Sequence, residues 1–199
     1  MGKRKIAVFD FDGTVTTKDT FLKFIKFAKG NPAFYIGFLL YSPVILAYKL
    51  KLYPNWKAKQ LVFNYFFKGM DYSEFALLGK RFVENVEAII RPLATDEISF
   101  HMLQGTKVYI ITASIYEWVF PWCIKNGIES LLATSIEIDS AGKLTGKFLS
   151  VNCYGREKIQ RLLEKEPDRN SYTLFAYGDS RGDKELIEFA DKGWFKKFN

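Results

Sequence analysis

Residues 9–16 read FDFDGTVT and place two acids, Asp10 and Asp12, directly after the apolar run Ile6–Phe9. Side chains two residues apart leave a strand in the same direction, so the two carboxylates face one place. Adjacent carboxylates repel each other, and Mg²⁺, a cation that prefers oxygen ligands, is the natural ion to hold them together. The pair alone is weak evidence, because acids at the end of a strand also begin ordinary turns.

The residues after Pro92 indicate an α/β protein. We predict strands and helices that alternate along this part of the chain and rejoin the strand at 4–10; the strands are 106–112, 131–138, 143–149 and 172–177, and the helices are 94–104, 115–126, 156–166 and 182–190. Such alternation predicts a parallel sheet with helices on both faces. Asp139–Gly142, between two of the strands, predicts a hairpin turn.

Residues 17–92, called here the helical segment, interrupt this pattern. They read as successive helices separated by breaks at 30–32, 53–55 and 69–71, where glycine, proline and asparagine gather. We therefore predict a core built from residues 1–16 and 93–199, with the helical segment inserted as a separate domain after the first strand.

The positive charge of the chain is concentrated in the helical segment. The net charge is +7, and the helical segment holds 12 Lys and Arg against 5 Asp and Glu, whereas the other residues hold 17 of each kind. A local excess of this kind favours an anionic partner, such as an anionic lipid or a phosphorylated substrate, and it also suits a solubilising surface. We expect no nucleic acid, because no motif that reads it is recognised.

Residues 30–48 carry no charge and approach the length of a membrane-spanning helix. A single crossing would separate Asp10 from the later strands of its own sheet, so we expect no span. Two interpretations remain: helices packed in a small domain, or a segment lying on a membrane surface. The first is favoured, and lysines keep the second open because anionic head groups attract them; against Asp19 alone they are Lys18, Lys23, Lys26, Lys29, Lys49, Lys51, Lys57 and Lys59.

The scarce cysteine and histidine residues limit the kinds of site. Cys123, Cys153 and His101 are the only members of these two residue types. So few residues of these types exclude a disulfide framework and a metal site built from several cysteines or histidines. The apolar stretch after the initial MGKRK is too short for a signal peptide. We expect a cytoplasmic protein and leave open a peripheral location on the inner face of the membrane.

Other polar residues stand at the predicted strand ends or at a helix start. Thr112 ends one strand, Lys158 falls in the first turn of a helix, and Asp179 and Asp183 follow a third strand. Each has an ordinary explanation as a helix cap, a surface lysine or a turn. The carboxyl ends of parallel strands form a ligand crevice, however, and together these groups would surround it. Carboxylates with Mg²⁺ opposite a lysine and N–H donors describe a phosphoryl-transfer site.

These pieces resemble the haloacid dehalogenase superfamily of aspartate-nucleophile phosphatases. Its motifs stand here as DFDGT (10–14), IIT (110–112), Lys158 and GDSRGD (178–183). The resemblance implies a Rossmann-like parallel sheet with a helical cap inserted after the first strand. The predicted hairpin, followed by NCYGREK, is similar to the phosphoserine-phosphatase-like subfamily, some members of which act on phosphatidylglycerophosphate.

The resemblance also implies roles. Asp10 would be the nucleophile, and Asp12 would protonate the leaving group and then activate water. Asp10, Asp179 and the backbone carbonyl of Asp12 would hold Mg²⁺, with Asp183 supporting them. Gly13, Thr112 and Lys158 would bind the phosphoryl oxygens.

The expected function is Mg²⁺-dependent hydrolysis of a phosphomonoester through an aspartyl-phosphate, with a phosphatidylglycerophosphate-like lipid as the sharper hypothesis. The alternative is a phosphatase for a small soluble metabolite such as phosphoserine. Asp19 is the only acid placed to bind the amine of phosphoserine, and lysines and aromatics follow it, which favours a lipid-linked phosphate. A phosphotransferase or mutase, or a non-catalytic membrane-surface module, is less well supported, the latter because the acids, threonine and lysine are all present.

Overall fold

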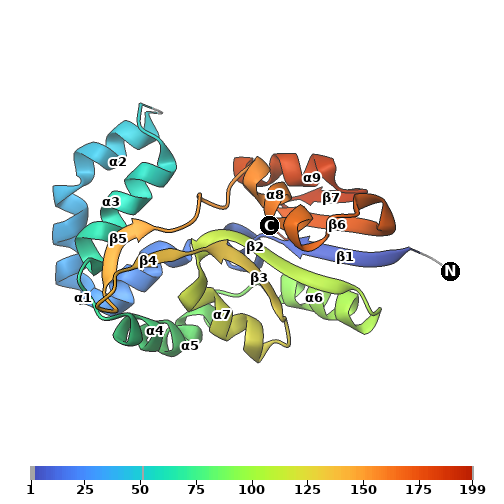
Figure 1. Ribbon diagram of the computed structural model, residues 1–199, viewed down its shortest axis with the longest axis horizontal. Helices are drawn as coiled ribbons and strands as arrows, with labels where there is room; N and C mark the ends of the chain where they lie inside the picture. Colours follow the sequence, from blue (N-terminus) through green and yellow to red (C-terminus); the bar gives the residue numbers. More distant parts are fainter. Residues whose placement is uncertain (1–2, 51, 199) are drawn as a thin grey trace.

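The computed structural model describes residues 3–50 and 52–198. Its centre is a five-stranded sheet in the order β3-β2-β1-β6-β7, in which every neighbouring pair is parallel. The strands are β1 Arg4–Phe9, β2 Lys107–Ile115, β3 Ser130–Thr134, β6 Tyr172–Gly178 and β7 Lys192–Phe195. The predicted α/β architecture is confirmed, and β1 lies in the middle of the sheet (Figure 1).

Both faces of the sheet are covered by helices. Ala7 and Phe9 of β1 pack in one apolar cluster with residues of α6 (Pro92–Leu103) and α7 (Tyr116–Lys125). Ile6 and Val8 pack in a second cluster, with residues of α8 (Arg156–Lys165) and α9 (Lys184–Phe189). A strand buried on both sides needs a continuous apolar run, and this explains the composition of β1.

The described residues of the helical segment form five helices, at the left of Figure 1. They are α1 Thr20–Leu40, α2 Ser42–Lys49, α3 Asn55–Phe67, α4 Tyr72–Arg81 and α5 Val83–Glu87. The three predicted breaks are found: Gly30 (φ 76°) interrupts α1 shortly before Pro32, Pro54 precedes α3, and Gly69 and Met70 lie between α3 and α4. Left-handed backbone at Gly30 is sterically free only for glycine.

The predicted strand 131–138 is wrong as a single strand. β3 ends at Thr134, and the chain leaves the sheet at Ser135 to form β4 (Ile136–Ile138), which pairs antiparallel with β5 (Leu144–Phe148). This hairpin packs against α3, where the rings of Phe63 and Phe148 are 5.4 Å apart. One apolar run therefore serves two sheets, because its second half pairs with β5, and β5 packs against α3.

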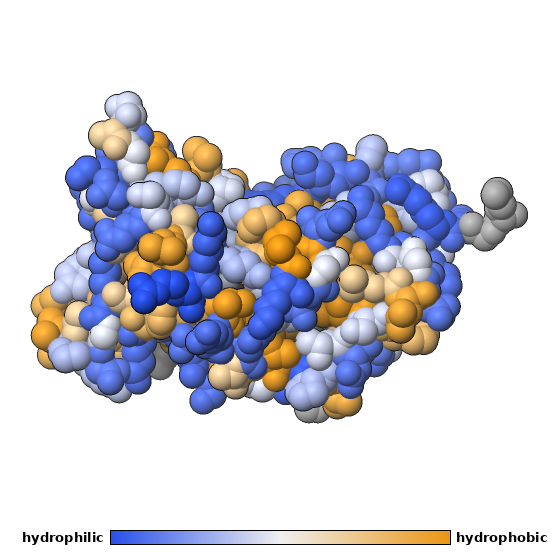
Figure 2. Space-filling model, turned by 90° about the horizontal axis from the view of Figure 1, so that it is seen from below, coloured by the Kyte–Doolittle hydropathy of each residue, from blue (hydrophilic) through white to orange (hydrophobic). Residues whose placement is uncertain are grey.

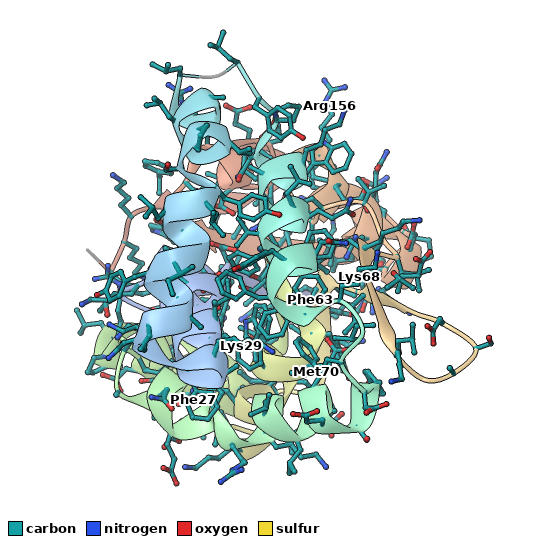
Figure 3. The ribbon with its side chains drawn as sticks, turned by 90° about the vertical axis from the view of Figure 1, so that its left-hand side faces the viewer. Phe27, Lys29, Phe63, Lys68, Met70 and Arg156 are labelled. Atoms are coloured by element: carbon teal, nitrogen blue, oxygen red, sulfur yellow. The ribbon has the colours of Figure 1, made fainter. Side chains whose placement is uncertain are left out.

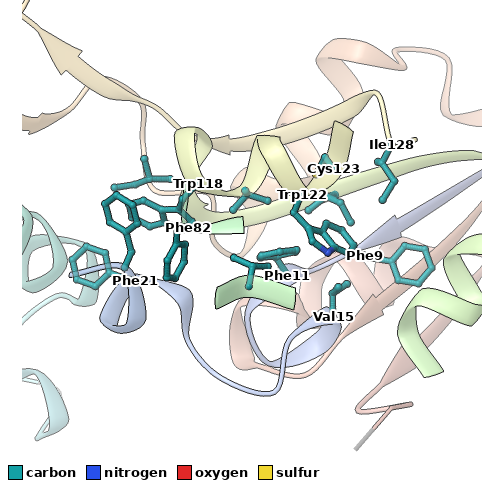
Figure 4. Packing of buried hydrophobic residues seen from close by; sticks show 14 of the residues in the cluster. Phe9, Phe11, Val15, Phe21, Phe82, Trp118, Trp122, Cys123 and Ile128 are labelled. Atoms are coloured by element: carbon teal, nitrogen blue, oxygen red, sulfur yellow. The ribbon is translucent and has the colours of Figure 1, made fainter. Parts of the chain in front are cut away.

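Aromatic side chains fill the junction between the helical segment and the core. Phe21 of α1, Phe82 and Trp118 of α7 converge there (Figure 4), and the rings of Phe24 and Trp118 stack 4.5 Å apart. A Cβ on Gly79 of α4 would lie 2.3 Å from the carbonyl oxygen of Glu117, so the helices approach closely at this glycine. Aromatic side chains from both parts thus join the helical segment to the core.

Two further features concern the surface. On the face shown in Figure 2, apolar residues appear over both the helical segment and the core, separated by hydrophilic ones. Within residues 3–50 and 52–198, no helix has both the length and the apolar character that crossing a bilayer requires.

Candidate active site

The turn after β1 is shaped by glycine. Asp10 continues the strand as extended backbone, and the tight turn Phe11–Val15 follows, with Gly13 at φ 87°. A Cβ at Gly13 would lie 2.4 Å from Oδ2 of Asp179, and the hydroxyl of Thr14 donates to Oδ1 of Asp179 at 2.9 Å. The first motif and the loop after β6 are therefore in direct contact, as their place at neighbouring strand ends predicts.

Three carboxylates gather at this point. Asp10, Asp179 and Asp183 each offer an oxygen within 4.8 Å of the others. Nζ of Lys158, at the start of α8, donates at 2.6 Å to Asp10 and at 2.6 Å to Asp183, and all three of these side chains are buried. Residues that are 148 positions apart in the sequence thus form one charged cluster.

Electrostatics of the cluster favour an added cation. Burial raises the pKa of Asp10 to about 8, against the attraction of Lys158, and repulsion by Asp183 and Asp12 contributes. Burial likewise raises the pKa of Asp179. Burial lowers the pKa of Lys158, but Asp10 and Asp183 outweigh it, so the net shift is upward. Three acids, of which Asp10 and Asp183 are buried and Asp179 is half-buried, leave a deficit of positive charge beside one lysine, and an oxygen-seeking divalent cation would correct it.

Asp183 organises the loop after β6. One of its oxygens accepts from Lys158, and the other accepts from the backbone N–H of Ser180 at 2.9 Å and from its hydroxyl at 2.7 Å. Lys158 and these donors together hold the pKa of Asp183 below its ordinary value, although burial alone would raise it. Asp183 is therefore a fixed negative charge that positions both Lys158 and the backbone around Asp179.

The carboxylate of Asp12 points elsewhere. It is not part of the three-acid cluster; its Oδ1 accepts from the backbone N–H of Thr20 at 2.9 Å, and its Oδ2 accepts from the hydroxyl of Ser114. Burial and the nearby charge of Asp19 raise the pKa of Asp12 to about 6, against its hydrogen bonds and the attraction of Lys59. The two acids of the first motif thus have different partners: Asp10 is bound by Lys158, and Asp12 by the backbone N–H of Thr20 and the hydroxyl of Ser114.

The structure places the remaining predicted residues as follows. Thr112 is buried near the carboxyl end of β2, the strand beside β1, and its hydroxyl accepts from the backbone N–H of Ser114 at 3.0 Å. The backbone N–H of Gly13 donates to the hydroxyl of Thr16 at 3.3 Å. Asp19 caps α1 by accepting from the backbone N–H groups of Phe21 and Leu22.

Lys59 is the residue whose importance the sequence does not reveal. We grouped it with lysines expected on the surface, and that is wrong: it reaches from α3 to the core, where Nζ donates to the carbonyl oxygen of Ala113 at 2.7 Å. Burial lowers the pKa of Lys59, although Asp19 and Asp12 attract its charge. It adds a positive charge from the helical segment on the Asp12 side of the site. Lys51 and the side chain of Lys49 lie outside what the structure describes.

The C-terminal residues also reach the site. Lys196, Lys197 and Phe198 line a small recess together with Gly13, Thr14, Gly178 and Asp179. The guanidinium of Arg91 donates to the carbonyl oxygen of Phe198 at 3.1 Å and to that of Thr16 at 3.3 Å. Thr16 and Arg91 lie where the chain passes between the core and the helical segment. The hydrogen bond of Arg91 to Phe198 therefore holds the C-terminal residues against these two crossings of the chain.

Comparisons with known proteins agree with this geometry. Haloacid dehalogenase-like hydrolases, as a family, match residues 7–188. Protein CicA of Caulobacter vibrioides is 32% identical over 200 residues, which cover 100% of this chain and 89% of CicA. A probable phosphatase of Mycobacterium tuberculosis is 27% identical, over 93% of this chain and 66% of its own length.

Solved structures share the fold. A Bordetella pertussis protein of unknown function superposes with a TM-score of 0.82 at 20% identity, over 95% of this chain and 88% of that one. A substrate-bound phosphoserine phosphatase has a TM-score of 0.64 at 15% identity, over 96% of this chain and 84% of its own. From the match along almost its whole length, the chain belongs to the haloacid dehalogenase-like hydrolases and is a phosphatase of that family.

Proposed function

We propose that this protein is a Mg²⁺-dependent phosphomonoester phosphatase in which Asp10 is the nucleophile and Asp12 the acid and base. The observation that carries the proposal is the contact of Lys158 with Asp10 and Asp183, within a cluster that also includes Asp179. An anionic phosphoryl group needs positive charge around it, and a nucleophilic carboxylate must remain ionised.

The proposed first step forms a bond between a carboxylate oxygen of Asp10 and phosphorus while the ester P–O bond breaks. Asp12 gives its proton to the departing alcohol oxygen. Its pKa of about 6 suits a group that must carry a proton and then lose it. In the second step Asp12 takes a proton from water, the water oxygen bonds to phosphorus, and the bond to Asp10 breaks, which releases phosphate.

Asp10, Asp179 and the backbone carbonyl of Asp12 would hold Mg²⁺, which supplies charge neutralisation for the phosphoryl oxygens. Lys158 and Thr112 would contact those oxygens from the protein side, with the Gly13 amide as a further donor. That amide now bonds Thr16 at the long distance of 3.3 Å, a weak contact that a phosphoryl oxygen could replace. Asp183 would keep Lys158 and the loop after β6 in place.

We further propose that the helical segment acts as a cap domain over the core formed by residues 1–16 and 93–199. Lys59 supports this, because it brings a positive charge from α3 to Ala113 and Asp12. A substrate with a second anionic group near its phosphomonoester would meet this lysine. A phosphatidylglycerophosphate-like lipid has such a group, and the basic character of the helical segment suits peripheral contact with an anionic membrane.

A small soluble metabolite, such as phosphoserine, is the alternative substrate. Its carboxylate would suit Lys59, but its ammonium group needs an acid, and Asp19 already accepts two backbone hydrogen bonds at the start of α1. A panel of lipid and soluble phosphomonoesters, assayed as purified compounds, would separate the two substrate classes.

The test of the proposed chemistry is Asp10→Asn, assayed by phosphate release from a soluble aryl phosphate with Mg²⁺ and with chelator. We expect no turnover by the variant, an unchanged thermal unfolding transition, and no wild-type turnover in chelator. Substantial turnover by Asp10→Asn would remove Asp10 as nucleophile, and full wild-type activity in chelator would remove the metal.

A further inference from the structure

An apolar surface lies at the end of the helical segment. Large apolar side chains of the second half of α1, of α2 and of the stretch before α3 are between 56% and 78% exposed. We call this set the apolar tip; its members are Tyr35, Ile36, Leu39, Leu40, Leu46, Leu50 and Leu52. Single exposed apolar residues are normal on a soluble protein, but seven within eighteen consecutive residues mark an interaction surface.

The apolar tip projects from the molecule. Figure 1 shows α2 and the adjoining end of α3 above and away from the core sheet. In Figure 3, which faces this end, α1 and α3 run side by side, with Phe27 and Lys29 on the first half of α1, before the break at Gly30. Because the apolar tip projects, it can insert into an extended surface while the core stays clear of that surface.

The charges around the apolar tip are of one sign. Residues 20–70 contain eight lysines, of which Lys59 reaches into the core, and no aspartate or glutamate. Two of these lysines stand beside exposed aromatic rings: Nζ of Lys26 lies 5.7 Å from the ring centre of Tyr35, and Nζ of Lys57 lies 5.4 Å from that of Trp56. A lysine with its apolar stem along such a ring can hold its ammonium group at the level of lipid phosphates while the ring sits deeper.

We propose that the apolar tip inserts into the surface of an anionic lipid bilayer, with Lys26 and Lys57 on the head groups. The charge pattern selects this partner over a second copy of the chain, because two such tips would bring lysines together without acids to pair them. An anionic bilayer suits both the apolar side chains and the lysines, because it offers acyl chains to the leucines and negative charge to the lysines.

Helix α3 connects this surface with the site. Trp56 is exposed in its first turn at the apolar tip, and Lys59, three residues later, reaches Ala113 in the core. Three residues advance a helix by about 4.5 Å, so a bilayer at the tip would lie close to the side of the site that Lys59 lines. This deepens the proposed function by naming the surface on which a lipid phosphate would be met.

Sedimentation of the full chain with vesicles tests the proposal without any turnover. We expect the wild type to pellet with phosphatidylglycerol vesicles at low salt, and much less with phosphatidylcholine vesicles or at high salt. Leu39→Glu/Leu52→Glu should weaken binding to phosphatidylglycerol at least about tenfold, since it places two acids where acyl chains would be. Leu103→Glu/Leu149→Glu is the matched control, because these two leucines are 85% and 70% exposed and lie outside the helical segment.

Trp56 supplies a second readout. Of the four tryptophans, Trp118 and Trp122 are buried, and Trp194 lies on β7, outside the helical segment. Brominated phosphatidylglycerol should therefore quench the wild type, and Trp56→Phe should remove most of that quenching. Hydrolysis of a soluble aryl phosphate should be equal in the wild type and in all of these variants.

Three results would overturn the proposal. The wild type could fail to pellet with phosphatidylglycerol at low salt, or Leu39→Glu/Leu52→Glu could bind as well as its control. Light scattering could instead show a dimer that Leu39→Glu/Leu52→Glu dissociates, which would make the tip a contact between copies. Failure of the proposed chemistry would appear differently, as aryl phosphate turnover by Asp10→Asn with vesicle binding intact.

Discussion

Gly13→Ala separates backbone strain from damage to the site. Gly13 has φ 87°, and an alanine in left-handed backbone costs about 1 kcal/mol. Its Cβ would also lie 2.4 Å from Oδ2 and 2.8 Å from Cγ of Asp179. Ordinary contacts begin near 3.4 Å, so the Asp179 carboxylate must move by about 1 Å. Gly105→Ala is the matched control: its φ is 67° and nothing lies within 4 Å of the added carbon.

We expect both variants to lose about 1 kcal/mol of unfolding free energy from the left-handed backbone, measured by urea denaturation. Only Gly13→Ala should lose catalysis: a displacement of about 1 Å in a reacting site can lower the rate by about 10²-fold. Phosphate release from an aryl phosphate, followed over a range of Mg²⁺ concentrations, measures this loss. If Gly13→Ala stays within a few-fold of Gly105→Ala at every Mg²⁺ concentration, the contact of Gly13 with Asp179 does not matter for the reaction and the argument is refuted.

Three further predictions concern other parts of the molecule. Asp12→Asn should slow turnover by about 10²–10⁴-fold, as loss of an acid–base group does. Its Mg²⁺ affinity, measured by calorimetry, should be unchanged, because the Asp12 carboxylate lies outside the three-acid cluster. Lost Mg²⁺ affinity would contradict this. Because the charge of Lys59 acts on Asp12, Lys59→Gln should reduce aryl phosphate turnover at least about tenfold, whereas Lys68→Gln, which changes an exposed residue just after the same helix, should not. Equal rates would exclude Lys59 from the site. Burial raises the pKa of Glu117 from 4.5 to about 7. The folded state then binds this proton more tightly than the unfolded one, so stability is lost as pH rises through this window. Glu117→Gln should accordingly be more stable than the wild type at pH 8, by at most about 3 kcal/mol, with no gain at pH 4; urea denaturation at both values checks it, and a gain of the same size at both would refute the assignment.

Local patterns in the sequence were sufficient for the architecture of the core. The apolar run before Asp10, the alternation after Pro92 and the glycine and proline breaks at Gly30 and Pro54 all act over a few residues. Strand and helix periodicity and turn chemistry depend on the residues involved, so these elements can be read from the chain. The assembly of Asp10, Asp179 and Asp183 also follows, because the ends of parallel strands must meet, and Lys158 joins them from the start of α8.

Other features depend on contacts that no short pattern carries. Ser135 marks where one apolar run divides between two sheets, and this is decided only by the pairing of its second half with β5, which packs on α3. Phe198 is tied to Arg91 across 107 positions, which gives the C-terminal residues a place that their composition does not indicate.

The sequence by itself determined which acids lie at the site, and the tertiary structure decided what surrounds each of them. Asp10 and Asp12 are two residues apart, yet one is held by Lys158 and the other by Ser114 and Thr20. Lys59 looks like its surface neighbours in the sequence and is distinguished only by the close approach of α3 to Ala113, 54 positions away. Chemical environment is set by such long-range contacts, because burial and charge depend on distance in space and not on separation along the chain.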